Sequence, residues 1–396
     1  GVAVADLVAR HKREYSALQR RLLSLAKKSG QSNAMLAYWT ERIEQVLTET
    51  DAAMLLASAG KDDVSMGISL HAKANTDLAK VWSRQATFGA NPLAAHLPVD
   101  AYLAMTQSYD PMASKRDLDT MMKFYTSAMN VPAAEVANFR ADVSRMMQLM
   151  GVHSGVALFR DGRFPLGMYG IFQAKDPAQL MAVMSRVALT SVRVSLQQMR
   201  AKMPANASKF LEVAEKTIAL GWGGMADSLV TRSQAWPVRF ERRQPTPAGL
   251  ACQGLRMTPD MLVFAKAAQR MRMLTMFVPK KVDFAVCTST KHVHFALGPN
   301  AIERIEAGET GAGASVAGAS WYQAASKVNG KHAQMTMALN PEPLLKIAAV
   351  FMPNLPDWPK GAAISTACLY APKSMRCDLR VPVVIADFVA VMRGAR

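Results

Sequence analysis

"STACLYAPKSMRCDLRVP", at residues 365–382, decides the fold class of this chain. Side chains alternate between the two faces of a strand, and on both sides of Pro372 one face carries the apolar and cysteine side chains. This pattern predicts a half-buried antiparallel hairpin. Proline fixes a negative φ, which disfavours the tight primed turns and favours a four-residue loop at 371–374. Such a loop places Cys368 directly opposite Cys377.

The four cysteines of the chain predict disulfides. Directly opposed residues have Cβ atoms about 4.5–5.5 Å apart, and a disulfide needs about 3.5–4.5 Å, so Cys368 and Cys377 bond with slight adjustment. Cys252 and Cys287 are then available for a second bridge. An even count with one plausible pair favours an oxidising compartment, and therefore a periplasmic or extracellular location. Four buried thiols in a cytosolic protein are the alternative.

The hairpin followed by a helix recurs along the chain. Similar stretches begin at Ala52, Ser154 and Val282. In the stretch from Ser154, the helix begins at Asp176-Pro177, a strong helix start. Four units of this kind predict an internal repeat. Strands that come as hairpins, with helices between them, predict an α+β fold with antiparallel sheets built from these units and long amphipathic helices packed on them.

Single strands and long helices fill the sequence between the units. Strands are expected from residues 101, 261 and 333, and helices at 6–28, 35–48, 116–129, 133–150 and 178–203. A proline- and glycine-containing stretch at 242–249 interrupts the pattern. It predicts two α+β domains, 1–243 and 250–396, with two hairpin–helix units each.

Composition indicates a globular chain of 396 residues, of which 50% are hydrophobic and 19% charged. The 27 methionines favour an irregularly filled core, and flexible apolar binding surfaces are the alternative. Apolar runs stay below the roughly 18–20 residues of a membrane span, so no transmembrane segment is expected. A start at Gly1 fits a mature form whose signal peptide has been removed.

The net charge of +17 is unevenly distributed, and residues 232–281 contain ten Lys or Arg and only two acidic residues. This density favours an acidic protein partner, a lipid surface or another polyanion, although it is also compatible with a solvated basic surface. Aromatic residues are sparse among the basic ones, which disfavours specific nucleic-acid recognition. The residues expected to bind a polyanion or partner are Arg239, Arg242, Arg243, Arg270, Arg272, Lys280 and Lys281.

Two further stretches resemble a family of uncharacterised exported bacterial proteins. "HLPVDAYLAM" at 96–105 is similar to a strand start of that family, and "RVPVVIADFVAVM" at 380–392 is similar to its closing strand and helix. The resemblance covers about half of the chain. It implies a periplasmic or surface location and brings no catalytic residues with it.

Catalytic and cofactor motifs are weak throughout, so no catalytic residue and no cofactor is expected. His292 and His294 in "KHVHF" point to one face of a strand and are a weak candidate for a metal site, for which only Cys287 and Asp283 offer further ligands. A polar outer strand face is the simpler interpretation. The glycine-rich stretch at 308–320 departs from both phosphate-binding fingerprints and is interpreted as a mobile loop.

These observations favour a non-enzymatic exported binding or scaffold protein, an accessory subunit of an envelope or surface assembly. The basic helix at 6–28 would suit docking against an acidic partner. The alternatives are a carrier of an apolar, lipid-like ligand in a Met- and Leu-lined cavity, and a polyanion-binding protein. An enzyme whose site combines residues distant in sequence also remains open.

Overall fold

The computed structural model describes most of the chain. The described residues are 2–3, 33–113, 131–161, 164–202, 221–232, 238–243, 249–259, 279–349 and 357–388, with isolated positions in the gaps. The expected helix at 6–28, the strand expected from Met261 and most of the helix expected at 116–129 lie outside them.

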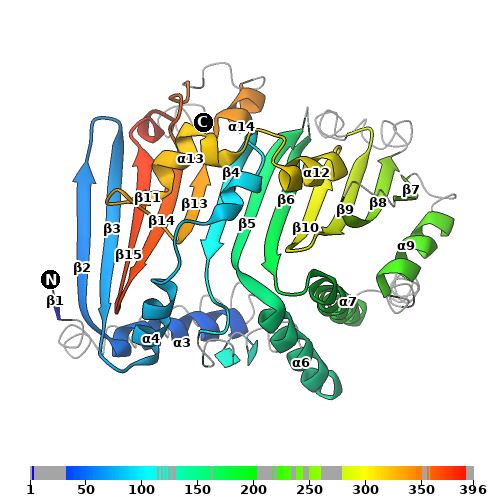
Figure 1. Ribbon diagram of the computed structural model, residues 1–396, viewed down its shortest axis with the longest axis horizontal. Coiled ribbons are helices and arrows are strands. Elements are labelled where there is room, and N and C mark those ends of the chain that lie inside the picture. The colour runs from blue at the N-terminus through cyan, green and yellow to red at the C-terminus, as the bar shows by residue number, and fades with distance from the viewer. Residues whose placement is uncertain are drawn as a thin grey trace.

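Within the described residues, one antiparallel sheet of thirteen strands runs through the molecule (Figure 1). It confirms the predicted α+β class with antiparallel strands. In sheet order the strands are β1 (Val2–Ala3), β2 (Thr50–Ala59), β3 (Asp63–Ala72), β15 (Ser374–Pro382), β14 (Ile364–Ala371), β13 (Met335–Leu339), β4 (Ala101–Ser108), β5 (Met150–Asp161), β6 (Phe164–Ala174), β10 (His292–Gly298), β9 (Val282–Thr288), β8 (Ala251–Pro259) and β7 (Val238–Arg243). A separate ribbon pairs β11 (Lys327–Val328) with β12 (Lys331–His332).

Helices cover both faces of the sheet. Within the described residues none of them is long and apolar enough to cross a membrane. They are α3 (Asn33–Glu49), α4 (Asp77–Gln85), α6 (Ala133–Leu149), α7 (Pro177–Lys202), α9 (Gly221–Arg232), α12 (Ala301–Thr310), α13 (Ser320–Ala325) and α14 (Glu342–Ala348), with the short 3-10 helices η1 (Pro92–His96) and η4 (Val316–Gly318).

The β14–β15 hairpin has the predicted register, since Cys368 pairs with Cys377. Its connection is shorter than the expected four-residue loop, because Ala371 already pairs with Ser374. Pro372 and Lys373 alone make the turn, and Lys373 adopts a φ of 61°. The predicted loop length is therefore wrong. The register is unaffected, because a four-residue loop and the observed two-residue turn both place Cys368 opposite Cys377.

The sheet joins both halves of the sequence. Strand β15 pairs with β3, β13 with β4, and β10 with β6, so strands from 1–243 and from 250–396 alternate across it. The internal repeat and the two-domain division stay predictions, and residues 244–248 at the expected boundary lie outside the described part. Four hairpins are present in the expected places: β2–β3, β5–β6, β9–β10 and β14–β15.

The main core lies under α12, α13, η1 and η4, on one face of the sheet. Phe159, Tyr169 and Ile171 are fully buried on this α12 face, in a core that also contains Ile305 of α12 and Trp321 of α13. Helices α6 and α7 pack on the opposite face over β5, β6, β9 and β10. Helices therefore cover the β6–β10–β9 region of the sheet on both faces.

Candidate functional site

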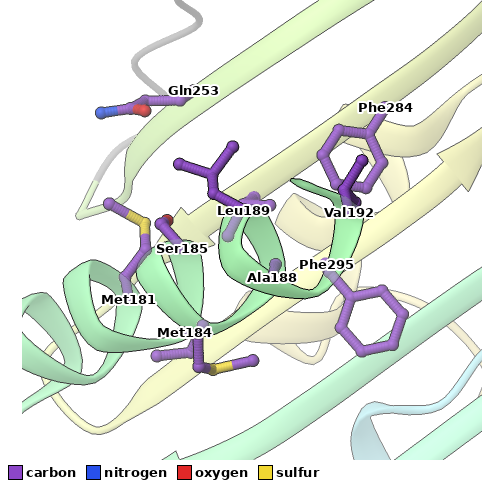
Figure 2. Close-up of a pocket in the computed structure, with 11 residues that line it drawn as sticks. Met181, Met184, Ser185, Ala188, Leu189, Val192, Gln253, Phe284 and Phe295 are labelled. Atoms are coloured by element: carbon purple, nitrogen blue, oxygen red, sulfur yellow. The ribbon is translucent and has the colours of Figure 1, made fainter. Parts of the chain in front are cut away.

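An apolar cavity of about 270 Å³ lies between α7 and the sheet (Figure 2). One wall is a stripe of α7 whose side chains recur at helical spacing, and the other wall is the α7 face of β8, β9 and β10. The stripe arises because positions three and four apart share one side of a helix. The lining residues are Met181, Met184, Ser185, Ala188, Leu189, Val192, Gln253, Phe284, Val286, Val293 and Phe295.

Strand alternation explains the apolar wall of this cavity. Phe284 and Val286 of β9, and Val293 and Phe295 of β10, occupy every second position and face α7. Phe295 lies over Gly170 of β6, where an added Cβ would come within 2.0 Å of the ring. The glycine therefore makes room for the aromatic side chain that forms one end of the cavity.

The polar members of the lining are Ser185 and Gln253. They lie toward the Met181 end of the cavity, whereas Phe284 and Phe295 lie toward Val192 (Figure 2). The cavity therefore has a polar end and an aromatic end. Val192 is 47% exposed, so the space opens to solvent along α7.

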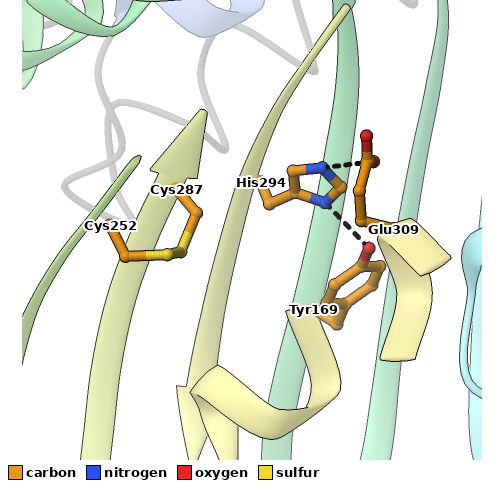
Figure 3. The surroundings of a disulfide bond; sticks show 5 residues. All are labelled: Tyr169, Cys252, Cys287, His294 and Glu309. Atoms are coloured by element: carbon orange, nitrogen blue, oxygen red, sulfur yellow. Dashed lines mark hydrogen bonds and ion pairs between the residues drawn. A yellow bond between two sulfur atoms is a disulfide. The ribbon is translucent and has the colours of Figure 1, made fainter. Parts of the chain in front are cut away.

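A cluster of titratable residues lies on the other face of the same strands (Figure 3). His294 of β10 is fully buried beneath α12, and its Nε2 is 2.9 Å from Oε2 of Glu309. Nδ1 of His292 is 3.1 Å from the same carboxylate oxygen. On its other side, Nδ1 of His294 is 2.9 Å from the hydroxyl of Tyr169, which lies on β6.

This cluster corrects the interpretation of "KHVHF" as a polar outer strand face. The two histidines do share a face, but α12 covers that face, and the side chain of His292 is only 14% exposed. The expected additional ligands are also wrong. Cys287 is bonded to Cys252, and Asp283 is ion-paired with Arg256, so Glu309 takes the position beside the histidines.

Glu309 belongs to the glycine-rich stretch that was interpreted as a mobile loop. Residues 308–310 form the last turn of α12, Gly311 caps it with a φ of 65°, and Val316 is fully buried. The loop interpretation is therefore wrong for these positions. Gly308 allows the helix to approach the sheet, because a Cβ there would come within 2.5 Å of the Tyr169 hydroxyl.

Burial sets the protonation of the cluster. It lowers the pKa of His294 to about 4, with the nearby His292 and His96 acting in the same direction and Glu309 opposing them. Burial opposes ionisation of Glu309, but hydrogen bonds from Ser289 and His292 outweigh it and lower the pKa of this carboxyl. Burial, followed by the charge of Glu309, raises the pKa of Tyr169. Near neutral pH the cluster therefore holds a neutral His294, a carboxylate and a protonated phenol.

The cysteines form the two expected pairs. Cys368–Cys377 bridges β14 and β15, and Cys252–Cys287 bridges β8 and β9, each with a Cα–Cα distance of 4.1 Å. Cys287 is also the register partner of His294 (Figure 3). The second disulfide therefore fixes the strand next to the histidine cluster.

The basic residues are brought together only in part. Arg239 and Lys281 lie at the same end of β7 and β9, because Arg239 pairs with Thr258 and β9 begins immediately after Lys281. Arg242 is ion-paired with Asp227 at 2.8 Å. Arg243 lies farther along β7, Lys280 precedes Lys281, and Arg270 and Arg272 lie outside the described residues. Polyanion binding by this set stays a prediction.

Comparison with known proteins gives no relative: no family model, no curated protein and no solved structure matches the chain.

Proposed function

We propose that this protein is an exported carrier of an apolar small molecule that carries a polar group at one end, such as an acyl chain. The observation that supports the proposal is the α7 cavity, whose walls are Met, Leu, Val and Phe side chains. Ligand sites in proteins are typically apolar concavities with a few polar groups that fix orientation. Ser185 and Gln253 would take that role here.

The size of the cavity limits the ligand. A cavity of about 150 Å³ holds benzene, so by the same proportion a cavity of about 270 Å³ holds on the order of ten carbon atoms. Because the space opens along α7, a longer chain would extend into solvent at the Val192 end. We expect the polar group beside Ser185 and the chain between Phe284 and Phe295.

Export is proposed on the basis of the two disulfides. Disulfides form and persist in oxidising compartments and are rare in the cytosol. All four cysteines are paired, which is the arrangement expected of a periplasmic or extracellular protein.

The test is ligand displacement with a matched pair of tryptophan variants. Ala188 lines the cavity, and Ala182, which is also exposed on α7, does not. Decanoate should displace bound 1-N-phenylnaphthylamine from the wild-type protein, as measured by fluorescence. The indole of Ala188→Trp should fill the cavity and weaken decanoate binding at least about tenfold, whereas Ala182→Trp should bind like the wild type.

Two results would contradict the carrier proposal. One is equal decanoate affinity in both tryptophan variants, which would place binding elsewhere. The other is a wild-type protein that binds neither the dye nor decanoate.

A scaffold role in a surface assembly is the second candidate, and it is favoured by exposed apolar side chains on β2 and β3. Leu55 is 82% exposed and Met66 is 55% exposed. Leu55 pairs with Ile68, which is 37% exposed, so these three residues form a strip on one face of the hairpin. Contiguous exposed apolar surface is typical of protein–protein contact sites.

A further inference from the structure

We propose that His292, His294 and Glu309 form a binding site for a divalent transition-metal ion, with Zn²⁺ as the best-suited ion. The site lies on the α12 face of β10, opposite the apolar cavity, and does not depend on the carrier function. The potential ligand atoms of the three residues lie within 4.8 Å of one another.

The distances fit a shared ion. At Zn–ligand distances of about 2.0–2.1 Å, the ligand atoms of a tetrahedral site lie about 3.3 Å apart. Oε2 of Glu309 is 2.9 Å from Nε2 of His294 and 3.1 Å from Nδ1 of His292. These two distances are within a few tenths of an ångström of that value. The ligating nitrogens of His294 and His292 lie within 4.8 Å of each other, so the two imidazoles would approach each other when they bind the ion.

Tyr169 supplies the outer-shell contact that metal-binding histidines usually have. In the metal-free cluster the carboxylate can only accept, so neutral His294 donates from Nε2 and its Nδ1 accepts from the Tyr169 hydroxyl. When Nε2 binds the ion, the imidazole proton moves to Nδ1 and is donated to the same hydroxyl. Such contacts fix the tautomer and orientation of a ligating histidine.

The donor set selects the class of ion. Two imidazoles and one carboxylate suit Zn²⁺, whereas Mg²⁺ and Ca²⁺ prefer oxygen ligands alone. Cys287 is held in a disulfide, so the site has no thiolate and is unsuited to Cu(I). Three protein ligands leave a fourth tetrahedral position for water, as in catalytic zinc sites.

The site has a route for entry and exchange. The side chain of Glu309 is 23% exposed, and that of His292 is 14% exposed. A cleft of about 360 Å³, lined in part by His96 and Gly308, lies beside the cluster. His96 donates from Nδ1 to the Gly308 carbonyl at 2.8 Å and contacts the His292 ring, with ring centroids 5.3 Å apart. A third imidazole therefore borders the open side of the site.

The test is a calorimetric Zn²⁺ titration of the purified, chelator-treated protein. The wild type should bind one Zn²⁺ per chain, and added Mg²⁺ should not compete. His292→Ala and Glu309→Gln should each weaken binding by at least about tenfold. His332→Ala, which alters an exposed histidine on β12, should bind Zn²⁺ like the wild type.

Tyr169→Phe separates an ordered metal site from weak surface binding. The substitution keeps the buried ring and removes only the hydroxyl, so we expect an affinity about ten to a hundred times lower. Co²⁺ should give the wild-type protein the visible absorption of a four-coordinate ion, and Glu309→Gln should lose it. A wild type that takes up no Zn²⁺, or equal affinity in His292→Ala and His332→Ala, would overturn the proposal.

Discussion

Arg256 and Asp283 form the most deeply buried ion pair among those described. They are register partners on β8 and β9, and two hydrogen bonds of 2.7 and 2.8 Å join them. The Asp283 side chain is 1% exposed and that of Arg256 is 15% exposed. Removing one partner of such a pair leaves the other charge buried and uncompensated.

We therefore expect Arg256→Ala to lower the free energy of unfolding by about 3–5 kcal/mol. Arg186→Ala is the matched control, because Arg186 pairs with Asp142 at 2.7 Å with its side chain 55% exposed. Arg186→Ala should lower the free energy of unfolding by only about 0–1 kcal/mol. Urea denaturation of both variants measures the difference. Equal losses would mean that burial does not govern the contribution of these pairs.

Individual residue environments were only partly predictable from the sequence. Alternation along β10 correctly places His292 and His294 on one face, because that rule is local. Tyr169 joins them through the β6–β10 pairing, which connects residues more than a hundred positions apart and leaves no local signal. Glu309 had a usable signal that was missed when its stretch was interpreted as a loop.

That signal is the length of α12. A helix that folds back over its own hairpin advances about 12 Å in the eight residues from Ala301 to Glu309, at 1.5 Å per residue. The four residues of β10 from Gly298 back to His294 cover about 13 Å. A returning helix therefore brings Glu309 level with His294.

At the scale of the elements, the two disulfides close loops of different length. Cys252 and Cys287 are 35 residues apart, and Cys368 and Cys377 are 9 apart. In the chain-entropy account, a bridge stabilises more when it closes a longer loop. The two bridges are otherwise comparable, since each joins register partners on neighbouring strands.

Replacing Cys252 and Cys287 by Ala should therefore cost about 1 kcal/mol more than replacing Cys368 and Cys377. Both double variants are compared with the wild type by thermal and urea denaturation under non-reducing conditions. A larger loss for the Cys368–Cys377 variant would show that packing outweighs loop entropy at these sites.

Hairpins were the elements that the sequence predicted best. Their registers follow from alternation and from turn residues within about twenty positions, as the Cys368–Cys377 pairing illustrates. The α7 cavity combines a helix stripe with side chains from β8, β9 and β10. Periodicity predicts the helix stripe, but it does not indicate which strands the stripe faces.

For the molecule as a whole, the exposed strip on β2 and β3 predicts self-association. Met66→Lys places a charge within the strip, and Met112→Lys places the same charge at another exposed methionine, which is 42% exposed. In sedimentation equilibrium at tens of micromolar, the wild type and Met112→Lys should exceed the monomer mass of 43.0 kDa. Met66→Lys should sediment as a monomer. A wild type that remains monomeric throughout would remove this support for the scaffold role.

The strand order also determines when the sheet can be completed. Among the described strands, β15 alone joins the β2–β3 hairpin to the rest of the sheet, and β14 and β13 lie between β15 and β4. Residues 374–382 must therefore be made before the β2–β3 hairpin can pair with its neighbour. Such long-range pairing slows folding and leaves strand edges exposed in the meantime. A chain that folds in this order would benefit from a chaperone that shields its first third until the last hairpin arrives.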